Sequence, residues 1–126
     1  HPQSGTPEHA LYLQWSWFAE ATYSRPIGEV VNHRRALGDA VKPDVIEEMA
    51  SRAALASQAV SDVVADQPFL LGDEFTAADI MMGYTVMLAA EVLKQTLSSP
   101  LARYWASLKS RPAFIAAKAE ERAMPK

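Results

Sequence analysis

The chain has 126 residues, of which 12 are Lys or Arg and 15 are Asp or Glu, so its formal net charge is −3. This balance disfavours a nucleic-acid partner, because nucleic acids are bound mainly through clustered positive charge. The lack of cysteine excludes disulfides and thiolate chemistry within the chain. No apolar stretch approaches the roughly 20 residues of a membrane span. We therefore expect a single intracellular domain over residues 1–126, without a membrane partner, whose length suffices for one hydrophobic core.

A long helix is predicted near the N-terminus, from about Pro7 to Tyr23. Thr6 supplies an N-cap hydroxyl, and proline at the first helical position loses nothing by lacking an N–H group. Two stripes of side chains recur at helical spacing. Because both carry apolar groups, this helix is expected to have two neighbours. The first stripe consists of Leu11, Trp15, Phe18 and Thr22, and the second of Trp17, Ala21 and Ser24.

The following segments are also predicted to be helical. Pro26 disfavours helical geometry at the residue before it, so we expect a break there. A weaker helix should follow over Ile27 to Leu37 and end at Gly38. A stronger helical pattern runs from about Pro43 to Ala65. Its inner side is predicted to consist of Val45, Met49, Arg52, Ala56, Ala59 and Val63.

Three further helices are predicted, over Ala77 to Lys94, Ser99 to Lys109 and Ala113 to Arg122. The first of them is apolar nearly all round but too short to span a bilayer, which is typical of the central helix of a bundle. Gly83 within it is expected where a neighbouring backbone comes close. No segment alternates with period two, so the sequence predicts an all-α bundle of about five or six helices. In the helix before the last, Leu101, Tyr104, Trp105 and Leu108 should point inward.

An acidic residue lies within the apolar stretch FLLGDEFTAADI, residues 69–80. With Thr76 as the N-cap, Asp79 becomes the third helical residue, and the two can form a reciprocal capping box with Asp in place of the usual Glu. Phe75 and Ile80 are spaced to form the accompanying hydrophobic staple. General acid or base catalysis would require a proton partner, whereas the box commits the carboxylate to the backbone. The sequence therefore predicts a structural role for Asp79.

Three segments resemble one known family. PFLLGDEFTAADI resembles the connection between the second and third long helices of the glutathione S-transferase C-terminal domain. LYLQWSWFAEAT resembles the first helix of that domain, and YWASLKSRPAFIAA resembles its late Trp-x-x-x-x-x-x-Arg-Pro-x-Phe segment. They occur in the family's order, and the resemblance covers nearly the whole chain. It implies a right-handed helical bundle and a cytoplasmic, homodimeric enzyme that conjugates glutathione to electrophiles in detoxification.

The resemblance also implies that catalysis depends on residues outside this sequence. In the family a thioredoxin-like N-terminal domain holds the co-substrate glutathione and the catalytic residue, so the chain alone is expected to be inactive and to bind no cofactor. The first helix of the C-terminal domain lines the electrophile pocket, which implies that apolar electrophiles contact this helix. An interface with the missing domain would leave the same exposed apolar face, and both interpretations stay open. The substrate-contacting residues implied are Tyr12, Trp17, Ala21, Tyr23 and Ser24.

Other sites and functions are less well supported. No second histidine lies three or four residues from His9 or His33, so no metal site is predicted. The same helical domain serves as an assembly module in translation factors and aminoacyl-tRNA synthetases, so a non-catalytic protein–protein interaction module is the alternative function. The aromatic first helix and the slightly acidic surface fit the enzyme better. A start at His1 instead of Met favours a fragment of a longer enzyme.

Overall fold

The computed structural model describes residues 1–124, which form six α-helices and two short irregular helical turns. Apart from one isolated bridge between Phe69 and Gly72, these residues contain no β-structure, and the predicted all-α class is confirmed. The elements are α1 (Pro7–Trp17), the π-helical segment η1 (Phe18–Ser24), α2 (Arg25–Leu37), the 3-10 turn η2 (Gly38–Ala40), α3 (Pro43–Val63), α4 (Ala77–Val92), α5 (Ser99–Lys109) and α6 (Pro112–Ala123).

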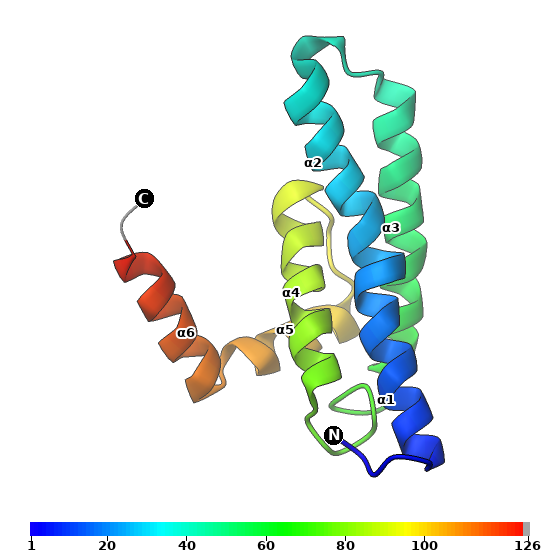
Figure 1. Cartoon of the computed structure of the whole chain (residues 1–126), viewed down its shortest axis with the longest axis vertical. Coiled ribbons are helices and arrows are strands. Elements are labelled where there is room, and N and C mark those ends of the chain that lie inside the picture. Colours follow the sequence, from blue (N-terminus) through cyan, green and yellow to red (C-terminus); the bar gives the residue numbers. More distant parts are fainter. Residues whose placement is uncertain (125–126) are drawn as a thin grey trace.

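The arrangement of the helices can be followed in Figure 1. α1, η1 and α2 continue one another as a single long rod, and α3 returns along it in the opposite direction. α4 packs against the α1–η1 part of the rod and runs in the same direction as the rod. α5 crosses behind α4, and α6 projects away from the bundle with contacts mainly to α5. The rod, α3, α4 and α5 therefore enclose the core, whereas α6 stays outside it.

The break expected before Pro26 is wrong, because the chain stays helical from Pro7 to Leu37. Proline cannot donate the usual backbone hydrogen bond, and its ring crowds the carbonyl group four residues earlier. The π-helical segment η1 ends at Ser24, two residues before this proline, and opens the turn where that conflict would arise. The Thr85 hydroxyl of α4 donates to the Ala19 carbonyl oxygen inside η1 at 3.3 Å, so α4 helps to hold the segment.

The π-helical segment also changes which side of the rod is buried. The buried side chains are four residues apart. This spacing is wider than the 3.6 residues of an α-helical turn, as a rod that contains a π-helical segment requires. Of the first predicted stripe only Trp15 is buried; Leu11 is 46% exposed and Thr22 is also exposed. The prediction that this stripe packs against a neighbouring helix is therefore largely wrong. The buried series along the rod is Trp15, Ala19, Tyr23 and Ile27.

The inner faces of α3 and α5 were predicted with different success. On α3 the expected face is wrong by about one position, because Arg52 is exposed and pairs with Glu48 instead of pointing inward. On α5 the burial of Leu101, Tyr104 and Leu108 is confirmed, and Trp105 is half-buried. Many residues of α3 are small, so its sides differ little in hydrophobicity. This explains why its inner face was predicted less accurately than that of α5. The buried residues of α3 are Ala53, Ala56, Ser57, Val60 and Ser61.

Gly83 is buried where α5 crosses α4. A Cβ atom at this position would lie 2.7 Å from Leu108 Cδ1 and 3.5 Å from Trp105 Cζ3. Side chains therefore come close here, and the expectation of a neighbouring backbone is wrong. The glycine lets two large side chains of α5 reach the surface of α4.

α4 ends in a left-handed turn at Lys94, whose φ is 55°; no other non-glycine residue described has a positive φ. This conformation costs about 1–2 kcal/mol for a residue with a Cβ atom. We expect Lys94→Gly to raise the free energy of unfolding by about 0.5–1 kcal/mol, since the greater freedom of glycine in the unfolded chain offsets part of the gain. Urea unfolding measures this change. Lys94→Ala removes the charge but keeps Cβ, and an equal gain from alanine would contradict the explanation.

Candidate functional site

Asp79 lies at the buried start of α4 and is 0% exposed. Its Oδ1 accepts hydrogen bonds from the Leu70 N–H at 2.9 Å and from the Tyr104 hydroxyl at 3.0 Å. Its Oδ2 accepts from the Thr76 N–H at 2.8 Å and from the Thr76 hydroxyl at 3.2 Å. The predicted capping box is confirmed. The carboxylate also joins the start of α4 to α5 and to the loop before it.

This arrangement leaves Asp79 and Tyr104 little capacity for acid–base chemistry. Burial, and secondly the neighbouring Asp79 carboxylate, raise the pKa of Tyr104 far above the ordinary value of about 10. The phenol therefore remains a proton donor to Asp79 throughout the physiological range. Because the Asp79 oxygens are occupied by donors from the protein itself, the cluster stabilises the fold and offers no open position to a substrate.

The hydrophobic staple is weaker than the sequence predicts. Ile80 is 61% exposed, so it buries little surface at the start of α4. Phe75 instead packs its ring against Phe69, with the ring centroids 5.6 Å apart. The Arg111 guanidinium lies over the Phe75 ring, 3.5 Å from its centroid. An aromatic pair and a cation–π contact thus hold the residue that the staple was expected to hold.

The residues implied as a substrate wall do not all lie on one face. Trp17 is 68% exposed, Ala21 is also exposed, and Tyr12 and Ser24 are half-buried. Tyr23 is different, because it is 0% exposed and belongs to the core. Its expected place beside the exposed face is wrong, and the four-residue spacing through η1 explains why. The exposed part of the candidate wall is formed by Trp17 and Ala21.

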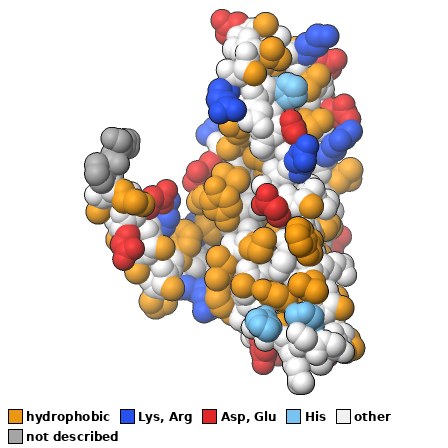
Figure 2. Space-filling model, in the orientation of Figure 1, with side chains coloured by type: hydrophobic (Ala, Val, Ile, Leu, Met, Phe, Trp, Pro, Cys, Tyr) orange, Lys and Arg blue, Asp and Glu red, His pale blue; other side chains and the backbone are white. Residues whose placement is uncertain are grey.

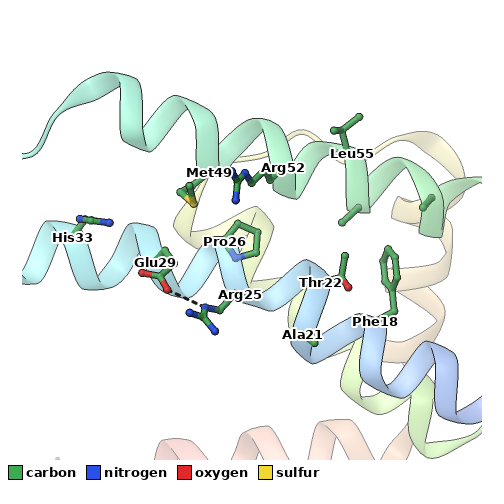
Figure 3. A pocket seen from close by; sticks show the side chains of 12 residues that line it. Phe18, Ala21, Thr22, Arg25, Pro26, Glu29, His33, Met49, Arg52 and Leu55 are labelled. Atoms are coloured by element: carbon green, nitrogen blue, oxygen red, sulfur yellow. Dashed lines mark hydrogen bonds and ion pairs between the residues drawn. The ribbon is translucent and has the colours of Figure 1, made fainter.

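Ala21 lines a groove between the η1–α2 part of the rod and α3, with a volume of about 730 Å³. Figure 3 shows Pro26 and Phe18 on one side and Met49 and Leu55 on the other. Arg25 pairs with Glu29 at 2.9 Å at its edge. The α3 side of this groove was not recognised from the sequence, because these residues stand among alanines without a distinctive motif.

A second groove, with a volume of about 360 Å³, lies between α4 and the α5–α6 segment. Its apolar lining includes Ile80, Tyr84, Trp105 and Phe114. Figure 2 shows hydrophobic side chains over α4 and on the inner side of α6, around the hollow that separates them. The sequence predicts α4 to be the enclosed central helix, because it is apolar nearly all round. In the structure one face of α4 remains uncovered. We refer to this feature as the α4–α6 groove.

Among residues 1–124 no helix is long and apolar enough to cross a membrane. The same residues contain no group of three or more His, Cys, Asp or Glu side chains placed to hold a metal ion. The candidate binding surfaces are the two grooves and the exposed Trp17 face.

No protein-family model matches the sequence, and no curated protein does. The fold, however, matches solved structures over nearly its whole length. The glutathione transferase of Methylococcus capsulatus str. Bath superposes with a TM-score of 0.81 at 25% identity, covering 98% of this chain and 59% of that chain. The chain has a glutathione transferase C-terminal helical fold.

Two fungal structures support the same assignment of the glutathione transferase fold. URE2P8 of Phanerochaete chrysosporium, solved with oxidized glutathione, has a TM-score of 0.82 at 19% identity and is matched over 97% of this chain and 56% of its own. URE2P6 of the same organism, also in complex with oxidized glutathione, has a TM-score of 0.78 at 25% identity over 94% of this chain and 56% of its own. The present chain thus spans less than two thirds of each of these transferases.

Proposed function

We propose that this chain is the helical half of a glutathione transferase, and that the complete protein conjugates glutathione to apolar electrophiles. The observation that carries the proposal is the match of 94–98% of this chain to three glutathione transferases. Two of those structures contain oxidized glutathione, which supports glutathione as the co-substrate here as well. The resemblance of the sequence to the same family supports the proposal independently of the superposition.

The proposal assigns no catalytic residue to the described chain. The Asp79 and Tyr104 groups are committed to each other and to the backbone, and no other buried ionisable pair forms a hydrogen bond within residues 1–124. A thioredoxin-like domain of the same polypeptide would supply the glutathione site and activate the thiol. The chain alone is therefore expected to be inactive, and the complete enzyme to be a cytosolic homodimer.

The part proposed for this chain is to form one wall of the electrophile pocket. Trp17 offers a large flat ring to solvent, and Ala21 beside it on the rod leaves room for a substrate. Aromatic walls bind flat apolar molecules because they provide a large contact area with few polar requirements. Tyr12 and Ser24 can contribute partly, since they are half-buried, whereas Tyr23 is excluded from direct contact by its burial.

Isothermal titration of glutathione tests the proposal. Glutathione is titrated into this chain and, in parallel, into the longer product of its native gene. Binding to the longer product alone is the expected result. A longer product that binds no glutathione and conjugates no electrophile would contradict the proposal and favour the interaction module.

Replacement of Trp17 tests the electrophile wall. In the longer product we expect Trp17→Ala to raise the KM for a flat aromatic electrophile about 5- to 30-fold, because the lost ring contact is worth about 1–2 kcal/mol. The KM for glutathione should stay unchanged. Leu37→Ala, which truncates an exposed side chain at the far end of α2, is the matched control. Equal effects of the two variants, or an effect of Trp17→Ala on glutathione alone, would contradict this assignment.

A further inference from the structure

We propose that Thr85 of α4 is a positioning residue for the electrophile wall, because its hydroxyl holds the π-helical segment η1 and thereby sets the direction of Trp17 and Ala21. The inference rests on the proposed function, which assigns those two residues to the wall. Thr85 is only 2% exposed, so it acts on a substrate through the rod and not by direct contact.

Thr85 is a polar residue on the buried side of an apolar helix. The other buried residues of α4 have no polar side chain apart from Asp79, which caps the helix. A buried hydroxyl costs free energy unless it forms a hydrogen bond. The Thr85 hydroxyl has two acceptors within reach, the Met81 carbonyl oxygen at 3.2 Å in its own helix and the Ala19 carbonyl oxygen at 3.3 Å in η1. It therefore links α4 to η1.

The contact within α4 directs the hydroxyl toward η1. A threonine in a helix has few rotamers, and one of them brings its hydroxyl to the carbonyl group four residues earlier. Met81 is that residue, and the same rotamer brings the hydroxyl to the Ala19 carbonyl oxygen. In a regular α-helix the Met81 carbonyl already accepts the backbone N–H of Thr85. The hydroxyl thus adds little to α4 itself, and its specific contribution is the contact with η1.

The π-helical segment sets the orientation of the residues before it. Trp15 and Ile27 are both buried, although a regular α-helix of this length would leave them about 120° apart around its axis. The wider turns of η1 remove this difference. Figure 3 shows Phe18, Thr22 and Pro26, also four residues apart, on the side of the rod that faces α3. The first part of the rod therefore keeps its orientation relative to α2 only while η1 stays π-helical.

The electrophile wall depends on this orientation. Trp17 and Ala21 belong to an exposed series with the same four-residue spacing, which also contains Leu13 and Arg25. If η1 relaxed to a regular α-helix, the residues before it would turn by about 100° relative to α2. The Trp17 ring would then turn away from the side of the rod on which Arg25 lies. By holding η1, Thr85 limits this movement.

Amide hydrogen exchange of the longer product tests whether the Thr85 hydroxyl holds η1. Thr85→Val replaces the hydroxyl with a methyl group of similar size, whereas Thr85→Ser keeps the hydroxyl and removes the methyl group. We expect exchange at residues 20–25 to be about 5- to 10-fold faster in Thr85→Val and unchanged in Thr85→Ser. A role in packing alone predicts the opposite order, because serine leaves a cavity. Unchanged exchange in Thr85→Val, or equal acceleration in both variants, would overturn the inference.

Steady-state kinetics of the same variants test the effect on the wall. For a flat aromatic electrophile we expect Thr85→Val to raise KM about 3- to 10-fold, with the KM for glutathione unchanged. Thr85→Ser should keep both values. Leu101→Val is the control for lost stability, because it shortens a buried side chain of α5, which packs against α3, α4 and α6. An equal rise in the electrophile KM of Leu101→Val would overturn the positioning role.

A double substitution tests whether Thr85 acts through Trp17. In the Trp17→Ala background, Thr85→Val should change the electrophile KM less than about 2-fold, because the ring whose direction it controls is absent. The exchange of residues 20–25 should still become faster in that background. Effects of the two substitutions that multiply fully would show that they act independently, and would overturn the inference.

The two measurements also separate this inference from the proposed function. A longer product that binds no glutathione and conjugates no electrophile would contradict the proposed function and the positioning role with it, even if Thr85→Val still speeds exchange in η1. An active enzyme in which Thr85→Val speeds that exchange but leaves the electrophile KM unchanged would support the transferase and overturn the positioning role alone.

Discussion

Asp79→Ala is expected to lower the free energy of unfolding by about 3–5 kcal/mol. The substitution removes the acceptor of four donors, the Leu70 N–H, the Thr76 N–H, the Thr76 hydroxyl and the Tyr104 hydroxyl. Each unsatisfied buried donor costs about 1–3 kcal/mol, and the loss of a buried charged partner has effects of similar total size. Because a domain of this kind has a stability of about 5–15 kcal/mol, the variant should lose a large share of its free energy of unfolding.

Urea unfolding of Asp79→Ala measures this loss, and two variants show where it comes from. Asp44→Ala is the matched control, since Asp44 is also an acid in the first turn of a helix but is exposed and makes no side-chain hydrogen bond described here. It should cost no more than about 1 kcal/mol. Tyr104→Phe removes one donor together with its bond and should cost about 1–2 kcal/mol. A similar loss for Asp79→Ala and Asp44→Ala would contradict the network described for Asp79.

The domain is expected to lose stability steeply above pH 10, because of two buried tyrosines. Burial raises the pKa of both Tyr23 and Tyr104 above the ordinary value. For Tyr23 the neighbouring Ser57 hydroxyl offsets part of the increase. Below pH 10 the folded and unfolded states both hold the phenolic protons, so these groups add no pH dependence. Above pH 10 the unfolded chain releases them while the folded chain keeps them, and unfolding is favoured.

The size of the alkaline effect follows from the number of protons involved. Each tyrosine whose folded-state pKa lies well above 11 lowers stability by about 1.4 kcal/mol between pH 9 and pH 11. Urea unfolding at both pH values measures the difference. Tyr104→Phe should start from a lower stability at pH 9 but lose about 1.4 kcal/mol less on going to pH 11. Tyr84→Phe, at an exposed position, should change neither quantity. An unaltered pH dependence in Tyr104→Phe would contradict the role of its burial.

Features determined by short stretches of sequence were predicted well. The capping box needs only Thr76 and Asp79 at a spacing of three, and the structure contains it. The start of α5 at Ser99 was recognised in a similar way, from a serine followed by a proline at an early helical position. These signals act within one helical turn and do not depend on where other helices pack. They also sufficed to indicate the family whose fold the chain has.

Features determined by contacts between distant segments were missed. Tyr104 is 25 residues from Asp79, and no local pattern indicates that its hydroxyl reaches the cap. The open face of α4 was missed because composition shows that a helix is apolar but not how many neighbours cover it. The burial of Tyr23 depends on the π-helical turn, whose support by Thr85 comes from 66 residues away. The candidate substrate wall was therefore predicted only in part.

The π-helical segment has a consequence for comparing this chain with its relatives. A π turn accommodates about one residue more than an α turn over the same rise. A relative with a regular α-helix in this place would align correctly only with a gap of about one position inside residues 18–24. An alignment that forbids gaps within helices would shift every residue before the segment by one place and rotate it by about 100° around the axis. The buried Trp15 and the exposed Trp17 would then be matched to the wrong positions.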